Sequence, residues 1–346
     1  MDKMNALHTK KLLSVISNEF LELIILPTEQ CNFRCTYCYE DFSIGKMKTP
    51  IVEGIKALMK NRVADLKILK ISWFGGEPLA AKDIVMNIAN HAMDLKKLYP
   101  NLQYQSGMTT NGYQLNIKLL TKLCELGINE YQISLDGSEK LHNTTRLRAD
   151  GAGTFNKIWD NLISAKNSTL DFKITLRIHV TPDNLDSLPH LVSDINQNFK
   201  NDSRFNVFFK TIENLGGPHS NTFRVLHGKD KPNILSELYQ QIDHSIHIEK
   251  VENRLPYICY AAQANSFLIR ANGRLGKCTV SLNDERNDIG EITSDGELIL
   301  DNEKLNPWIR GVSTHHLMDL ECPMVNFPSS SILGKRNITI KVEKAM

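Results

Sequence analysis

The sequence lacks a long apolar run. Its longest apolar stretches, such as Leu23–Leu26, suit a buried strand and fall far short of the roughly 20 residues of a membrane-spanning helix. The N-terminus, Met1–Asn5, lacks the basic and then apolar layout of a secretory signal peptide. Neither charge sign dominates, because 41 basic residues nearly balance 39 acidic ones, whereas nucleic-acid and membrane-surface binding usually rely on a basic excess. We therefore expect a cytoplasmic protein that binds neither nucleic acid nor membrane.

Nucleotide-binding loops are also missing from the sequence. The segment Gly151–Phe155 lacks the third glycine of a dinucleotide-binding loop, and no G-x4-G-K-[ST] phosphate loop is present. The adjacent pair His315 and His316 is expected to be solvated rather than to bind a metal. The sequence therefore gives no sign of a nucleotide-binding loop, and its cysteines are the stronger signal.

Seven cysteines are present, an odd number. In a reducing compartment this favours metal ligation or thiol chemistry over a disulfide framework. Cys124 lies on the apolar stripe of a predicted helix and is expected to be a small buried side chain. The other six form two spaced groups, which are Cys31, Cys35 and Cys38, and then Cys259, Cys278 and Cys322.

Strand-like and helix-like segments alternate over the first two thirds of the chain. The predicted strands are 21–26, 68–74, 102–108, 130–135, 172–180 and 205–211, and the predicted helices are 51–61, 83–98, 115–126, 155–165 and 185–199. Repeated strand–helix units predict a parallel sheet with ligands beyond the carboxyl ends of the strands. Six units are too few for a closed eight-fold barrel, so the expected fold is α/β, a partial (β/α)6 barrel with a smaller C-terminal α+β domain.

The pattern changes near Leu215–Pro218, and a helix is predicted over 234–246. Two hairpin signals follow, one around Asn272-Gly273 and one around Asp295-Gly296. We expect an N-terminal extension (1–18), a core domain (19–215), a helical connector (216–250) and a C-terminal domain (251–346).

The first cysteine group, Cys31, Cys35 and Cys38, is a C-x3-C-x2-C run directly after the first predicted strand. Three thiolates on one short loop suit one inorganic iron–sulfur cluster, whose fourth iron stays free for another ligand. The alternative is a zinc site, but zinc sites prefer paired C-x2-C units and four ligands, and no second pair follows this loop.

This loop resembles that of the radical S-adenosylmethionine (SAM) superfamily, in which C-x3-C-x-aromatic-C follows the first strand. The resemblance implies a [4Fe–4S] cluster whose open iron chelates the amino and carboxylate groups of SAM. One electron then cleaves SAM and yields a 5'-deoxyadenosyl radical. Tyr37 stands at the family's aromatic position, whose backbone is expected to contact the adenine.

Three later segments strengthen this resemblance, which covers residues 21–180. Trp73–Pro78 resembles the family's GGE motif, which binds the SAM amino group, and implies Gly75, Gly76 and Glu77 as SAM contacts. Thr109–Gly112 resembles a TNG segment and implies Thr110 and Asn111. Ser134 and Arg146, twelve residues apart, correspond to the residues that bind the ribose and carboxylate of SAM, a role that suits the arginine fork.

The second cysteine group looks like the opening of the auxiliary-cluster domains called SPASM and twitch, with C-x13-G-x4-C from Cys259 through Gly273 to Cys278. It departs from them after Cys322, where Phe327–Ser331 replaces the expected further cysteines. The resemblance implies at most one auxiliary iron–sulfur cluster, with its fourth ligand open. The alternative is a degenerate domain that holds ordinary thiols.

Relatives with this domain pair mostly modify ribosomally made peptides. The resemblance therefore implies a peptide maturase that abstracts hydrogen and leads to crosslinking, epimerisation or oxidation. Thr279 stands where sulfatase maturases carry an aspartate, which disfavours formylglycine formation. A reductant such as flavodoxin or ferredoxin is expected, and a separate leader-binding protein is possible because residues 1–18 are too short for a peptide-binding module.

Two other functions stay open at this point. One is a radical dehydrogenase or isomerase that acts on a small molecule. The other is a non-catalytic iron–sulfur protein with a redox or interaction role, which would leave the SAM-binding motifs without a purpose. The sequence leaves open the catalytic base, the substrate and the bond that is formed or broken.

Overall fold

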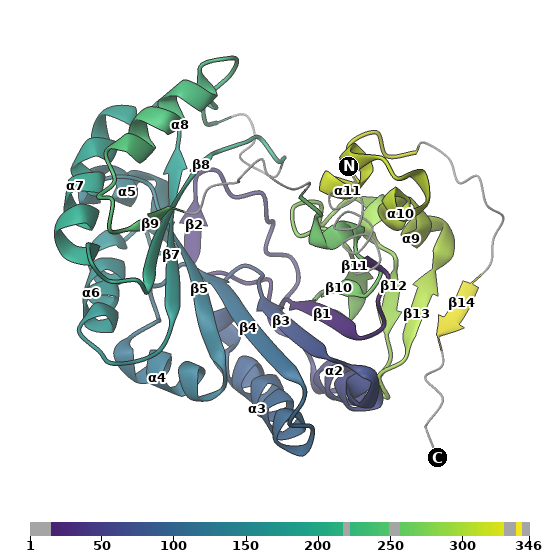
Figure 1. Ribbon diagram of the computed structural model, residues 1–346. Coiled ribbons are helices and arrows are strands. Elements are labelled where there is room, and N and C mark those ends of the chain that lie inside the picture. Colours follow the sequence, from purple (N-terminus) through teal and green to yellow (C-terminus); the bar gives the residue numbers. More distant parts are fainter. Residues whose placement is uncertain (1–14, 217–221, 249–256, 329–336, 341–346) are drawn as a thin grey trace, which may run out of the picture.

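The computed structural model describes residues 15–216, 222–248, 257–328 and 337–340 (Figure 1). One twelve-stranded sheet runs through the molecule in the order β14-β13-β12-β11-β10-β1-β3-β4-β5-β7-β8-β9. The parallel strands are β1 (Phe20–Ile25), β3 (Ile68–Trp73), β4 (Gln103–Thr110), β5 (Ile128–Leu135), β7 (Lys173–Val180), β8 (Phe205–Thr211), β9 (His247–Ile248) and β10 (Ser266–Ile269). The mixed α/β fold class with a large parallel sheet is thus confirmed.

Helices cover the outer side of the curved sheet (Figure 1). They are α2 (Thr49–Arg62), α3 (Lys82–Leu98), α4 (Ile117–Glu125), α6 (Phe155–Lys166), α7 (Leu188–Phe199) and α8 (Lys231–Gln240). In α3, Ile84, Ile88, Ala92 and Leu95 are all buried, and their spacing of three or four residues forms one apolar stripe. The helices therefore cover the outer face of the sheet, and the polar side chains of the strands point to its inner face.

Two short elements that the sequence did not predict shape the first cysteine loop. Strand β2 (Phe33–Cys35) pairs antiparallel with β6 (Arg146–Arg148), in the register Cys35↔Arg146. Helix α5 (Glu139–Thr145) leads directly into β6. This small second sheet places Arg146 beside the cysteine loop across more than a hundred residues of chain.

The C-terminal part extends the main sheet rather than forming a separate one, because β10 pairs with β1 in parallel. The antiparallel strands are β11 (Arg274–Gly276), β12 (Gly290–Ile292), β13 (Leu298–Asp301) and β14 (Asn337–Ile340). Helices α9 (Asn302–Ile309), α10 (Gly311–Thr314) and α11 (Leu317–Glu321) pack beside them (Figure 1). Both predicted hairpins are confirmed, as β10–β11 and β12–β13.

The expected connector helix is shorter than predicted and starts earlier. Helix α8 ends at Gln240, and the segment to Ile246 is not helical; it leads into β9, which joins the sheet edge beside β8. Among the described residues, no helix is long and apolar enough to span a membrane.

Candidate active site

The first cysteine loop leaves the carboxyl end of β1 and carries three free, partly buried thiols, Cys31, Cys35 and Cys38. The three lie close enough for the charges of Cys35 and Cys38 to act on Cys31. The Cys31 sulfur accepts a hydrogen bond from the Phe33 amide at 3.3 Å. The loop therefore gathers three sulfur donors and supplies a backbone amide to one of them, as iron–sulfur sites do.

Burial makes these thiols poor nucleophiles by themselves. It raises the pKa of Cys31 far above its usual value, with the carboxylate of Glu77 adding to the effect. It also raises the pKa of Cys35, and raises that of Cys38 to about 12. Burial therefore disfavours the free thiolate, the reactive form of cysteine, whereas a metal cation deprotonates a thiol that it binds.

The number of thiols bears on the kind of metal centre. A structural zinc site takes four protein ligands, and this loop offers three thiols. In a [4Fe–4S] cluster, by contrast, each thiolate binds a different iron. The donor set and its spacing therefore fit a cluster better than zinc.

Gly75 and Gly76 bring the end of β3 into contact with the cysteine loop. A Cβ on Gly76 would lie 2.5 Å from the Gln30 carbonyl oxygen, and one on Gly75 would lie 2.3 Å from the Thr28 carbonyl oxygen. Gly75 also has a φ of 119°, which side chains with a Cβ rarely adopt. Only glycine therefore fits at these two positions.

Glu77 joins three of the motifs through its fully buried carboxylate. Its oxygens accept hydrogen bonds from the Asn111 amide and the Thr110 hydroxyl, each at 2.7 Å, and from the Leu79 amide at 3.0 Å. Asn111 also donates its side-chain amide to Asn32 at 2.8 Å, within the cysteine loop. Residues that follow β3 and β4 are thus joined to the cysteine loop by hydrogen bonds.

Tyr37 lies at the centre of a second buried network. Its hydroxyl accepts a hydrogen bond from Arg146 Nη1 at 2.8 Å and donates to Asp136 Oδ1 at 3.0 Å, with His179 Nδ1 at 2.9 Å. Sequence reasoning missed Asp136 and His179 as site residues. The signal that could have found them is their position, since they follow or end neighbouring parallel strands at the same edge of the sheet.

Arg146 keeps one unused donor in this network. Its side chain is buried, and its Nε has no hydrogen-bond partner. Ser134, twelve residues before Arg146 in the sequence, is buried near the end of β5. An unpaired buried N–H is costly, so a ligand with an anionic oxygen fits here.

A chamber of about 1310 Å³ lies on the inner face of the strands. Its wall runs from Lys67 and Ile68, where β3 begins, to Trp73 and Phe74, where it ends. At about 3.3 Å per residue, this is roughly 20 Å. The wall includes Gln105, Gln132, Thr175, Arg177, Asn206, Tyr260 and Thr279. The chamber thus follows β3 along its whole length.

The second cysteine group is also brought together by the fold. Charges on Cys278 and Cys322 act on Cys259, and burial raises the pKa of Cys259 to about 11. Asn287 accepts a hydrogen bond from the Cys278 amide at 2.9 Å and donates to the Cys278 carbonyl at 2.8 Å. Cys322 is exposed.

Cys124, the seventh cysteine, packs on α4 against the apolar core as expected, but it is half-buried rather than buried.

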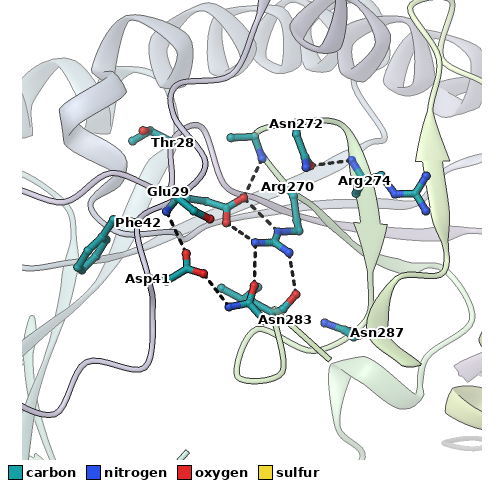
Figure 2. Close-up of polar contacts among 12 residues, drawn as sticks. Thr28, Glu29, Asp41, Phe42, Arg270, Asn272, Arg274, Asn283 and Asn287 are labelled. Atoms are coloured by element: carbon teal, nitrogen blue, oxygen red, sulfur yellow. Dashed lines mark hydrogen bonds and ion pairs between the residues drawn. The ribbon is translucent and has the colours of Figure 1, made fainter. Parts of the chain in front are cut away.

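An ion pair ties the cysteine loop to the C-terminal hairpin (Figure 2). Glu29, two residues before Cys31, accepts hydrogen bonds from Arg270 Nη2 at 2.6 Å and Nε at 3.2 Å. Their side chains are only 4% and 15% exposed. Asn283 donates to Asp41 at 3.1 Å on the far side of the same loop. The C-terminal strands therefore brace the loop from both ends.

Comparison with known proteins agrees with this geometry. The model of the Radical SAM superfamily matches residues 25–195. The chain is 27% identical over 229 residues to a cysteine-type anaerobic sulfatase-maturating enzyme of Clostridium novyi, covering 63% of this chain and 59% of that one. It is 28% identical over 172 residues to a GTP 3',8-cyclase of Haemophilus influenzae, covering 45% and 49%.

Among solved structures, the fold is similar to native anSMEcpe with bound AdoMet and Cp18Cys peptide. The TM-score is 0.62 at 20% identity, and the match covers 84% of this chain and 83% of that one. The chain spans only 59% and 49% of the lengths of these two sequence relatives. Residues 25–195 of the chain belong to the radical SAM superfamily.

Proposed function

We propose that this chain is a peptide maturase: it reductively cleaves SAM and abstracts a hydrogen atom from a ribosomally made peptide, which leads to crosslinking, epimerisation or oxidation. The observation that carries the peptide substrate is the chamber wall. Gln105, Gln132 and Asn206 line it, and no hydrogen bond joins their amide side chains to another described residue. Amide side chains pair with the N–H and C=O groups of a peptide backbone.

The size of the chamber points the same way. Drug-sized ligands occupy pockets of about 300–1,000 Å³, and this chamber is larger, at about 1310 Å³. A wall of roughly 20 Å accommodates about six residues of extended peptide at 3.3–3.6 Å per residue. The C. novyi maturase and the peptide-bound neighbour support this assignment, while the GTP cyclase keeps a small-molecule substrate as the second candidate.

Cys31, Cys35 and Cys38 would hold a [4Fe–4S] cluster, which the buried thiols and their spacing fit. When bound, the cluster supplies the electron that cleaves SAM to a 5'-deoxyadenosyl radical. The β3 side of the cysteine loop is formed by Gly75, Gly76 and Glu77. Hydrogen bonds from Thr110 and Asn111 hold Glu77 in place.

On the opposite side of the loop, Tyr37 and Ser134 lie toward the adenosine part of the proposed SAM site. The unpaired Nε of Arg146 would donate to the SAM carboxylate, which suits the fork of a guanidinium. Asp136 and His179 position Tyr37 and Arg146 through the network around the Tyr37 hydroxyl.

Cys259, Cys278 and Cys322 would hold one auxiliary iron–sulfur cluster in a SPASM- or twitch-like domain spanning 251–346. The fourth ligand of this cluster stays open: His315 and His316 are exposed, and Ser329 lies outside the described residues. The test is iron per chain after anaerobic reconstitution of a Cys31/Cys35/Cys38→Ala variant. Residual iron with a charge-transfer absorption supports the second site, and its complete loss overturns it.

The proposed reaction is tested with the anaerobically reconstituted chain, SAM, a flavodoxin or dithionite reductant, and the peptide encoded beside its gene. A separate leader-binding protein is added in a second arm. We expect 5'-deoxyadenosine together with a peptide that loses two hydrogens, or one that takes up deuterium at unchanged mass. SAM cleavage that leaves the peptide unmodified in both arms, with GTP consumed instead, would overturn the peptide assignment.

A further inference from the structure

Arg177 lies inside the substrate chamber on β7. Side chains alternate along this strand: Ile174, Leu176 and Ile178 are buried in the core, while Lys173, Thr175 and Arg177 line the chamber. Arg177 pairs in register with Ser134 of β5. Its guanidinium therefore extends from the chamber wall at the level of the proposed SAM site.

No described carboxylate forms an ion pair with this guanidinium, and Glu213 acts on it only through space. Its Nε is buried without a hydrogen-bond partner, and no ion pair joins Arg177 to any residue that the structure describes. Two other cations of the wall are paired, Lys67 with Glu19 at 2.7 Å and Lys70 with Glu22 at 2.9 Å. Lys173 is exposed at the start of β7, so Arg177 is the partly buried cation of the wall that has no ion-pair partner among the described residues.

The surroundings of Arg177 make this unpaired charge costly. Burial lowers the pKa of Arg177, and the like charge of Arg146 adds to this, yet a guanidinium remains protonated in proteins. A buried charge without a partner is unfavourable unless something supplies the opposite charge. Its planar fork matches a carboxylate, which it binds by two parallel hydrogen bonds.

Arg146, which is buried, and Arg177, which is partly buried, suit two different ligands. Arg146 donates to Tyr37 and faces the cysteine loop, and it is not part of the chamber wall, whereas Arg177 is. One arginine therefore suits SAM, and the other suits a group that occupies the chamber. This division rests on the function proposed above.

We propose that Arg177 binds a carboxylate of the substrate peptide and so selects peptides with an acidic group next to the residue that is modified. The carboxylate belongs to an aspartate or glutamate side chain or to a peptide C-terminus. The free amides of Gln105, Gln132 and Asn206 then hold the flanking backbone.

The test is an affinity selection that needs no turnover. Reconstituted full-length chain with SAM and without reductant is mixed with synthetic acetylated, amidated heptapeptides that carry Asp, Glu, Asn or Gln at the centre of random flanks. A second arm uses peptides with Asn or Gln at the centre and a free C-terminus. Bound peptides are counted by mass spectrometry for wild type, Arg177→Gln, Arg177→Lys and the exposed charge control Lys157→Gln on α6.

We expect wild type and Lys157→Gln to enrich peptides with an acidic group about tenfold over their amide counterparts, the effect of a charge-assisted hydrogen bond. Arg177→Gln loses this preference, and Arg177→Lys keeps part of it. The arm that shows enrichment tells a side-chain carboxylate from a C-terminal one.

Three outcomes overturn the proposal: no acidic preference in wild type, an unchanged preference in Arg177→Gln, or a comparable loss of SAM affinity in Arg177→Gln, which would make Arg177 a SAM ligand. Displacement of the bound peptides by GTP that depends on Arg177 also overturns it. Failure of the proposed function is seen separately, as absence of 5'-deoxyadenosine under reducing conditions.

Discussion

Replacement of Arg270 by methionine tests how the C-terminal hairpin supports the cysteine loop. The change removes both hydrogen bonds to Glu29 and the one from Arg270 Nη1 to the Leu282 carbonyl at 2.7 Å. Glu29 keeps a long hydrogen bond of 3.3 Å from the Ala271 amide. A carboxylate that is 4% exposed is then left without its counter-ion.

The expected loss in free energy of unfolding is about 3–5 kcal/mol, the usual cost of removing one partner of a buried ion pair. For a chain of this size, about 2 °C per kcal/mol is appropriate, so the melting temperature falls by about 6–10 °C. Because Glu29 is two residues from Cys31, less iron should also be retained by the first cysteine group.

Arg274→Met is the matched control on the same hairpin. Arg274 pairs with Asp288 at 2.5 Å and Glu291 at 3.3 Å, but its side chain is 40% exposed, and surface pairs contribute about 0–1 kcal/mol. Thermal melting and iron analysis of both variants test whether the Arg270–Glu29 ion pair supports the cysteine loop. Equal, small effects of the two substitutions would refute the bracing role, as would loss of stability without loss of iron.

Two further predictions concern the site. Gly76→Ala would place a Cβ 2.5 Å from the Gln30 carbonyl and displace the cysteine loop, so iron retention should fall at least severalfold while the far-ultraviolet circular dichroism stays unchanged; normal iron content would contradict this. His142 accepts a hydrogen bond from the Asp136 amide and lies 3.1 Å from the Thr154 hydroxyl. Burial lowers its pKa to about 3, below the unfolded value of about 6.5. The unfolded chain therefore binds the proton first as the pH falls below 6.5, and stability decreases. Between pH 7 and 5 this residue should cost about 2 kcal/mol, a loss that His142→Asn, which keeps an acceptor, should abolish in urea titrations; an equal pH slope in both proteins would exclude it.

Much of the fold was predictable because local signals were strong. The helix predicted over 51–61 lies within α2, and the strand predicted over 21–26 corresponds to β1. The short strands β2 and β6 were missed because three residues each, partly polar, carry no periodic signal. The docking of β10 on β1 was also missed, since a turn signal such as Asn272-Gly273 predicts a hairpin but not the sheet edge that receives it.

The candidate site was predictable where a motif lies on one loop and not where it needs distant partners. Contiguous residues made it possible to predict the first cysteine group and the glycine pair Gly75-Gly76, and the structure brings the two motifs together. His179 and Asp136 meet Tyr37 only through the strand order.

One signal in the sequence was overlooked. Parallel strands with both faces buried read as continuous apolar runs, whereas β7 alternates polar and apolar residues. That alternation marks an inner face that lines a polar chamber.

The central claim is that Cys31, Cys35 and Cys38 support reductive cleavage of SAM. The most direct measurement is 5'-deoxyadenosine formed by the anaerobically reconstituted chain with SAM and dithionite, compared with a Cys35→Ala variant. The account predicts 5'-deoxyadenosine from the wild type and none above background from the variant. Intact SAM in the presence of a reduced cluster, or equal cleavage by both proteins, would contradict it.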